Sequence, residues 1–347
     1  MSKLKFFVVS FFVVLFFFSH RITPVRAQAT GNFDVTVSPV FFDFNAKPGG
    51  TVNGSVRLRN NTPVNLPIKV DIKKMGGDQN GELTIQNAPD ETTAWFQIKN
   101  TGIEAPAREW INVPFTIKVP DNAAYGYYWA LSFTQDTAAE KAATGAKINA
   151  AIVVPVLLNV GREGAKTEGK ITEFTSDSNW YEYLPVNFDT IFANNGNVHV
   201  RPKGNIFIKD WTGKTVATLE VNPSDGAILP GTKKTFTTPW NDSFIWSETK
   251  VEDGKIVLDK NGKPVKELKF RFDKILDLRV GKYTATTLMV ISTGSKDIAL
   301  ERSISFFVFP WKIILGAVVF VLFALLGIIT TTKSLGIKIM KLFGKKS

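Results

Sequence analysis

The chain has 347 residues, a formal net charge of +11 and no cysteine, which excludes disulfide bonds, thiol nucleophiles and zinc sites built on cysteine. Ten of its 42 basic residues lie in two terminal segments without acidic residues, 1–29 and 310–347, which leaves 32 basic and 31 acidic residues between them. The net charge of +1 over this middle part gives no reason to expect a nucleic acid as partner.

The first 29 residues have the order of a secretory signal peptide. Lys3 and Lys5 precede an apolar run, 6–18, and small residues offer cleavage after Ala27 or Ala29. This order predicts a signal peptide at 1–29. An uncleaved membrane anchor is the alternative, although the apolar run is short for a full span.

Alternating apolar and polar residues predict β-strands over residues 30–160. Strand-like segments flank a turn at Asn60-Asn61-Thr62-Pro63, and "VPFTIKV" and "GYYWALSF" follow at 113–119 and 126–133. The segment "AIVVPVLLNV" at 151–160 is apolar throughout, with Pro155 marking a bulge or a sheet edge. Short strands without a long amphipathic helix predict an immunoglobulin-like β-sandwich.

The same pattern begins again after a charged, glycine-rich segment at 161–169, which predicts a linker. A second asparagine pair occurs at Asn194-Asn195-Gly196, and Gly126-Tyr127-Tyr128 has a counterpart in Gly281-Lys282-Tyr283. We therefore expect a second sandwich at 170–309, with the two asparagine pairs as equivalent turns between strands. The predicted fold class is all-β: two tandem immunoglobulin-like β-sandwiches plus one C-terminal transmembrane helix.

Three segments between the strands stand out. The Ala/Thr-rich segment at 134–147 predicts a loop or short helix, and the Asp-Gly and Asn-Gly turns within 250–268 predict a projecting hairpin. The loop at 76–83 carries Asp78, Asn80 and Glu82, whose oxygens suit calcium or simply a turn. We expect no cofactor and no metal site.

The C-terminal segment has the features of a membrane anchor. Residues 313–329 carry no charge, Trp311 stands where an interfacial aromatic residue belongs, and the anchor is predicted at 310–332. A basic tail at 333–347 predicts a cytoplasmic end, so the chain is expected to be a single-pass type I protein of the cell membrane with an extracellular ectodomain. A buried core helix is the alternative. The anchoring residues predicted here are Trp311, Lys312, Lys333, Lys338 and Lys341.

The remaining side chains give little support to catalysis. Once a signal peptide is removed, His199 is the one histidine left, and no nucleophile motif surrounds it. Asp177, Glu182 and Asp189 could in principle act in pairs on a glycoside, but acidic residues are common on solvated strands. We expect a protein that is not an enzyme.

Aromatic residues in turn-rich segments are the candidate ligand-binding residues. The stretches "SNWYEYLP" at 178–185 and "PWNDSFIW" at 239–246 hold them, and aromatic faces can stack on sugars or anchor a protein. The alternative is that they plug the sandwich ends or pack at the domain junction. The candidates are Trp180, Tyr181, Tyr183, Trp240 and Trp246.

The N-terminal half resembles the first domain of the WxL-interacting protein family. The similarity rests on the stretch 41–72 with its Phe-Asp-Phe strand, Pro48-Gly49 and asparagine turn, on "DQNGELTI" at 78–85, and on 112–133. That family combines a signal peptide, two β-sandwich domains, one membrane span and a short basic tail. The resemblance implies peptidoglycan binding by the first domain and binding of a host or partner protein by the second.

These observations predict a membrane-anchored cell-surface binding or scaffold protein whose ectodomain engages cell-wall glycan or another surface protein. The alternative is an envelope assembly or secretion factor that acts by β-strand exchange with a client protein. Unpaired strand edges would favour this alternative, whereas lysines or a proline on those edges would count against it. A glycan-cleaving enzyme is the third and weakest possibility.

Overall fold

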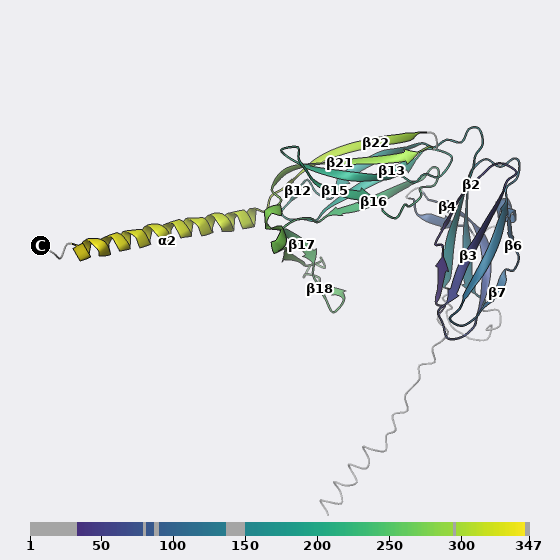
Figure 1. Cartoon of the computed structure of the whole chain (residues 1–347), viewed down its shortest axis with the longest axis horizontal. Coiled ribbons are helices and arrows are strands. Elements are labelled where there is room, and N and C mark those ends of the chain that lie inside the picture. The colour runs from purple at the N-terminus through teal and green to yellow at the C-terminus, as the bar shows by residue number, and fades with distance from the viewer. Residues whose placement is uncertain (1–32, 79–80, 87–89, 137–149, 294–295, 344–347) are drawn as a thin grey trace, which may run out of the picture.

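The computed structural model describes residues 33–78, 81–86, 90–136, 150–293 and 296–343. These residues form mostly β-strands, followed by one long C-terminal helix (Figure 1). The predicted signal peptide at 1–29, the segment 137–149 and the side chains of Lys338 and Lys341 lie outside the description.

The N-terminal strands form two facing sheets. One sheet has the order β1 (Val35–Ser38), β3 (Thr51–Asn60), β8 (Trp110–Lys118), β6 (Phe96–Ile98). The other has the order β2 (Phe42–Ala46), β10 (Ala151–Val160), β9 (Tyr125–Gln135), β4 (Leu66–Gly77), β5 (Leu83–Ile85), with β7 (Gly102–Ala105) also paired to β4. A short 3-10 helix, η1 (Glu91–Trp95), precedes β6.

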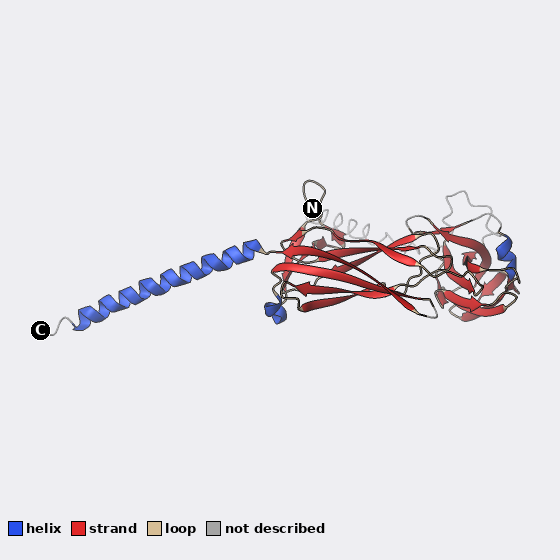
Figure 2. Ribbon diagram, turned by 90° about the horizontal axis from the view of Figure 1, so that it is seen from above, coloured by secondary structure: helices blue, strands red, loops and turns tan. Residues whose placement is uncertain are grey.

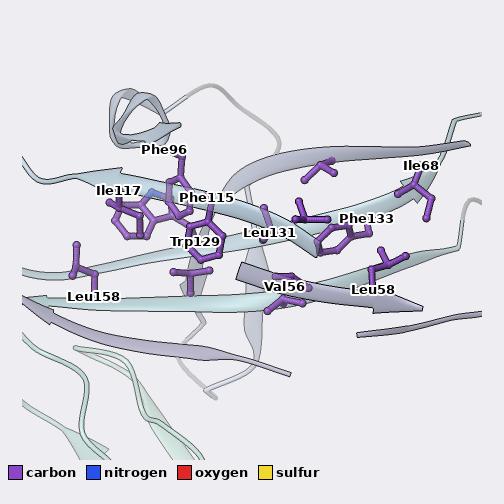
Figure 3. Packing of buried hydrophobic residues seen from close by; sticks show 14 of the residues in the cluster. Val56, Leu58, Ile68, Phe96, Phe115, Ile117, Trp129, Leu131, Phe133 and Leu158 are labelled. Carbon is purple, nitrogen blue, oxygen red and sulfur yellow. The ribbon is translucent and has the colours of Figure 1, made fainter. Parts of the chain in front are cut away.

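Alternate residues of these strands fill a core between the two sheets. In β3, Val56 and Leu58 are buried while Arg57 and Arg59 are exposed, as the period of two predicts. Trp129 lies at the centre of this core among aromatic and aliphatic side chains (Figure 3), and its indole nitrogen donates to Thr92 Oγ1 at 2.9 Å. Burial of these apolar side chains, together with the hydrogen bond of the Trp129 indole nitrogen, stabilises the N-terminal sheet pair.

The C-terminal strands repeat this arrangement around a second core. One sheet has the order β11 (Gly169–Ser176), β13 (Val186–Asn194), β16 (Lys233–Trp240). The facing sheet has the order β12 (Trp180–Tyr181), β22 (Asp297–Val308), β21 (Gly281–Ser292), β14 (Lys203–Asp210), β15 (Thr215–Val221). Phe188, Phe192, Trp240 and Phe306 are fully buried between the two sheets.

The two asparagine pairs are equivalent turns, as the sequence predicts. Asn60 ends β3 and Asn194 ends β13, and both side chains are buried. Asn60 Nδ2 donates to the carbonyl oxygens of Val64 and Ala105, at 2.7 and 2.9 Å. Asn194 Nδ2 donates in the same way to those of Val198 and Ile228, at 2.9 and 2.8 Å.

The paired tyrosines also have matching roles. The hydroxyl of Tyr127 in β9 accepts a hydrogen bond from the amide of Ala124, and the hydroxyl of Tyr283 in β21 accepts one from the amide of Val280, both at 3.1 Å. Each tyrosine therefore fixes the loop that leads into the penultimate strand of its sheet pair.

The segment 250–268 forms the predicted hairpin. Strand β17 (Ile245–Thr249) pairs with β20 (Lys266–Phe270), and β18 (Val251–Glu252) pairs with β19 (Lys255–Ile256) across a turn with positive φ at Asp253 and Gly254. A second 3-10 helix, η3 (Phe272–Asp277), follows β20.

One helix ends the described chain. A link of two residues, 309–310, joins β22 to helix α2 (Trp311–Phe343), which leaves the C-terminal sheet pair at one end (Figures 1 and 2). Its part Trp311–Lys333 is long and apolar enough to cross a membrane, and none of its apolar window is buried within the described structure.

Candidate functional site

The structure corrects the sequence interpretation for two of the five candidate aromatic residues. Trp240 has no exposed surface and packs against Tyr283 and Phe306 in the C-terminal core. Tyr181 is also buried, its hydroxyl accepting from the amide of Ser178 at 2.8 Å and donating to Asp177, and burial raises its pKa to about 12. Both side chains serve packing, because a buried ring offers no face to a ligand.

The other three aromatic residues keep exposed surface. Trp180 is 63% exposed and stacks on Phe307, with ring centroids 4.9 Å apart. Trp246 is half-buried beneath the guanidinium of Arg271, 4.8 Å from its ring centroid. Tyr183 is also half-buried and precedes Leu184, which forms a bridge with Trp246. Each of these rings is therefore partly covered by the protein itself.

The candidate carboxylates have separate structural partners. Asp189 accepts from Thr237 Oγ1 at 2.6 Å, and Glu182 pairs with Lys312 at 2.9 Å. In the loop at 76–83, Asp78 Oδ1 accepts from the amide of Glu82 at 2.8 Å, which is turn chemistry. Within the residues that the structure describes, no group of three or more His, Cys, Asp or Glu side chains could hold a metal ion.

Strand β10 has an open edge along half of its length. It pairs with β9 over its whole length, Ala151–Val160, but β2 pairs with it only over Val156–Val160. The chain reaches β2 from β1, which pairs with β3 in the facing sheet and also lies close to β10 where the chain crosses between the sheets. In the described part of the chain, β9 is the strand partner of residues 151–155, and no second strand pairs with them.

The hydrogen-bonding groups at this edge follow from the alternation of the strand. The amide of Gly161 donates to the carbonyl of Ala46 in β2, so odd-numbered residues direct their amides away from β9. The amides and carbonyls of Ala151 and Val153 then point out from the open edge, whereas those of Ile152 and Val154 face β9. Pro155 has no amide hydrogen, which is tolerated only because its nitrogen lies on the unpaired side.

The open edge of β10 carries no charge, unlike its counterpart in the other sheet pair. Strand β22 pairs with β12 only at Phe307 and Val308, so its earlier residues have an open edge as well. That stretch of β22 carries Asp297, Glu301 and Arg302, and charged residues discourage the addition of another strand. The segment Ala151-Ile152-Val153-Val154-Pro155 has no charged residue, but Pro155 guards its inner end, so the unguarded part of this edge is 151–154.

A cavity adjoins the open edge. Its volume is about 190 Å³, and it lies between the outer face of β10 and loops of the C-terminal sheet pair. Phe41, Pro155 and Leu157 line one side, and Leu229 and Lys234 line the other. Pro155 is the one residue of the open edge that lines this cavity.

Charged side chains join the two sheet pairs next to this cavity. Asp43 of β2 accepts from His199 Nε2 at 3.0 Å and from Arg201 Nε at 2.7 Å. Arg201 also stacks over Phe41, 4.6 Å from its ring centroid. His199, the one histidine considered for catalysis, is thus a buried contact of the junction.

We expect the junction to weaken in acid because of Asp43. Burial raises the pKa of Asp43, but its hydrogen bonds with His199 and Arg201 outweigh this and hold the pKa below 3.8. The Asp43 carboxylate contributes its full stabilisation at pH values above the pKa of an unfolded aspartate. This contribution is lost as the pH falls through the lower pKa of Asp43 in the folded protein. Asp43→Asn should cost about 2 kcal/mol at neutral pH and progressively less as the pH falls below 3.8, measured by hydrogen exchange of residues 198–202. A cost that does not fall with pH would contradict this role.

A glycine at the tip of the β4–β5 connection also meets the C-terminal sheet pair. Gly81 has φ +81°, and a Cβ there would lie 1.9 Å from the carbonyl oxygen of Lys233. The loop at 76–83, in which calcium was considered, therefore makes a close backbone contact between the two sheet pairs. Sequence patterns within one sheet pair contain no signal for this contact.

Comparison with known proteins identifies no family. No family model matches the chain, and no curated protein matches it. Among solved structures, the class 5 fimbriae chaperone CfaA is 16% identical and covers 69% of this chain and 100% of its own, with a TM-score of 0.34. The CupB2 chaperone of Pseudomonas aeruginosa is 8% identical over 77% of this chain and 99% of its own, with a TM-score of 0.33. A PapD-like domain of human CEP192 is 12% identical over 37% and 85%, with a TM-score of 0.25.

Proposed function

We propose that this chain is an envelope assembly factor that adds an extended segment of a client protein to the open edge of β10. In this proposal the two sheet pairs are tandem immunoglobulin-like domains, and α2 holds them on the extracytoplasmic side of the membrane that it spans. The observation that carries it is the five-residue stretch 151–155, apolar, uncharged and paired on one side only. Main-chain hydrogen bonds of Ala151 and Val153 would hold the added strand.

A protein client is favoured over a cell-wall glycan. The glycan hypothesis needs exposed aromatic faces, and Tyr181 and Trp240 are buried while Trp180 is covered on one face by Phe307. Strand addition needs unpaired backbone groups, which residues 151–154 supply, and the cavity begins at Pro155 at the inner end of this stretch. Pro155 removes one donor at the inner end of the edge, so the client would bond mainly with Ala151 and Val153.

The anchor proposal rests on α2 and its flanks. The span Trp311–Lys333 is apolar, and the lysines that follow it favour a cytoplasmic C-terminus. Both sheet pairs would then lie on the outer side, where the resemblance to WxL-interacting proteins also places them. That resemblance stays a prediction.

Peptides selected for binding test this mode of recognition. The full chain in lipid nanodiscs would be screened against a displayed library of extended peptides about eight residues long. N-methylation at every second residue of a selected peptide removes the amides on one of its edges. Two methylated peptides are compared, one with methyl groups on its odd-numbered residues and one with them on its even-numbered residues. If the client adds as a strand, one of the two should bind about ten-fold or more weakly, a loss of about 1.4 kcal/mol, and the other should bind as the unmethylated peptide does. Equal effects of the two methylation patterns, or no selected peptide, would contradict the proposal.

A charged edge provides the matched variant. Ala151→Lys with Val153→Lys places two lysines on the open edge of β10, and we expect binding of the selected peptide to fall by about ten-fold or more. Gln97→Lys places a lysine on β6, the edge of the facing sheet that is opposite to β1, and should leave binding unchanged. If the β6 variant loses binding and the β10 variant keeps it, the site has been assigned to the wrong edge.

A further inference from the structure

Large apolar side chains gather at the end of the C-terminal sheet pair from which α2 leaves. Trp180 lies in β12, Trp211 in the turn after β14, and Phe272 and Ile275 in η3, and their exposed fractions range from 59% to 76%. Phe309 lies in the link to α2 and Trp311 is the first residue of the helix, and they are 43% and 49% exposed. We call these six residues the anchor-side rim.

Strand pairing places all of them at one end. Trp180 is opposite Phe307, near the end of β22, and Asp210, which precedes Trp211, is opposite Tyr283 near the start of β21. Gly281, which follows the η3 segment, is opposite Val308. Figure 2 shows the short helix η3 at the same end of the strands as the start of α2.

The opposite end of the same sheet pair has a different surface. The loops 195–202 and 222–232, which the structure describes in full, contain none of the exposed large apolar residues. Those loops face the N-terminal sheet pair, as the hydrogen bond from the amide of Gly126 to the carbonyl of Asn197 shows. The exposed aromatic residues are therefore not spread evenly over the surface, and such concentrations mark a binding surface.

The start of α2 is fixed to this end rather than tethered loosely. The amide of Phe309 donates to the carbonyl of Tyr181 at 2.8 Å, and Lys312 pairs with Glu182 at 2.9 Å. Asp242, which lies near η3, pairs with Lys274 and Arg279. A helix that spans a bilayer from here would hold the rim against the lipid headgroups, where tryptophan and phenylalanine are favoured.

We propose that the anchor-side rim binds the interfacial region of the bilayer that α2 spans. The lipid surface, rather than a second copy of the chain, is the occupant because the rim is continuous with the apolar helix through Phe309 and Trp311. Contacts on several sides of the helix start would keep the C-terminal sheet pair seated on the membrane. The open edge of β10 would then stand at a fixed height above the lipid. This inference rests on the membrane anchoring proposed above.

Spin labels on single cysteines test the proposal, because the chain has no cysteine of its own. The full chain would be placed as one copy per nanodisc of phosphatidylcholine and phosphatidylglycerol. Labels would replace Asp273 beside the rim, Glu220 at the far end of β15, and Val319 within α2. We expect the label at 273 to be shielded several-fold from a water-soluble nickel reagent relative to the label at 220, and the label at 319 to lie in the hydrocarbon.

A rim variant and the helix label separate the possible failures. Adding Phe272→Gln and Trp211→Gln should return the label at 273 to the water accessibility of the label at 220. If 319 lies in the hydrocarbon while 273 is as accessible as 220, the rim proposal is overturned and the anchor stands. If 319 is in water, both are overturned. Shielding of 273 that appears only with two or more copies per disc would assign the rim to self-association and overturn lipid binding.

Discussion

Replacing Trp240 by alanine should lower the free energy of unfolding of the C-terminal sheet pair by about 4 kcal/mol. The indole is fully buried, packs against Tyr283 and Phe306 at centroid distances of 5.2 and 6.0 Å, and has Arg279 over its ring at 5.8 Å. Alanine would leave a large cavity among these groups, and closely packed strands can collapse only partly to fill it. Hydrogen exchange of β13 and β21 amides measures this loss within the C-terminal core, apart from the N-terminal core.

Trp180→Ala is the matched control. Trp180 is 63% exposed and its main contact is one stacked ring, so we expect a loss of less than about 1 kcal/mol in the same measurement. If both variants lost the same amount, the assignment of Trp240 to the core and Trp180 to the surface would be wrong. If Trp240→Ala cost nothing, Trp240 would have to be exposed in solution.

Asn194→Ala should cost about 3 kcal/mol in the same sheet pair. The amide of Asn194 donates to two carbonyl oxygens, and its Oδ1 accepts from the amide of Gly196 at 2.9 Å. Alanine removes these three bonds and the partner of the buried Val198 carbonyl, whereas the carbonyl of Ile228 still accepts from Val200 and the amide of Gly196 still donates to Glu168. An unsatisfied buried group costs about 1–3 kcal/mol, and each lost hydrogen bond costs about 1 kcal/mol. The loop after β13 should therefore open together with the core.

The neighbouring asparagine is an internal control for this prediction. Asn195 is exposed and adjacent to Asn194, so Asn195→Ala should change the free energy of unfolding by less than about 0.5 kcal/mol. Asn60→Ala should repeat the large loss in the N-terminal sheet pair, because Asn60 makes the same bonds there. Urea unfolding followed by hydrogen exchange would compare the three variants. Similar losses for Asn194 and Asn195 would contradict the buried role of the first residue of each pair.

Much of the fold could be read from the sequence because its signals are local. The alternation of Val56 and Leu58 with two arginines predicts a strand with one buried face, and the structure confirms it. The asparagine turns at Asn60 and Asn194 and the hairpin at 250–268 depend on residues close in sequence, and they were predicted correctly.

The aromatic site was predicted wrongly at Trp240 because strand β16 was not recognised in the sequence. Strand β16 ends at Trp240, and its inward residues are Phe236, Thr238 and Trp240. The interpretation placed this tryptophan in a turn-rich segment, where the direction of a side chain cannot be inferred. The alternation over 236–240 would have placed the indole in the core.

The open edge of β10 could not be derived from local patterns. Its existence depends on where β2 begins to pair with β10, and these strands are far apart in the sequence. The junction formed by Asp43, His199 and Arg201 likewise joins distant segments. The local signal that pointed to the edge was Pro155, since proline within a sheet is confined to edges and bulges.

Amide hydrogen exchange along β10 tests the central claim most directly. In the free protein, the amides of Ala151 and Val153 should exchange rapidly, because they point out from an open edge. Those of Ile152 and Val154 should be protected by their bonds to β9. Binding of a selected peptide should then protect Ala151 and Val153. If all four amides are protected in the free protein, the edge is already covered and strand addition at this site is contradicted.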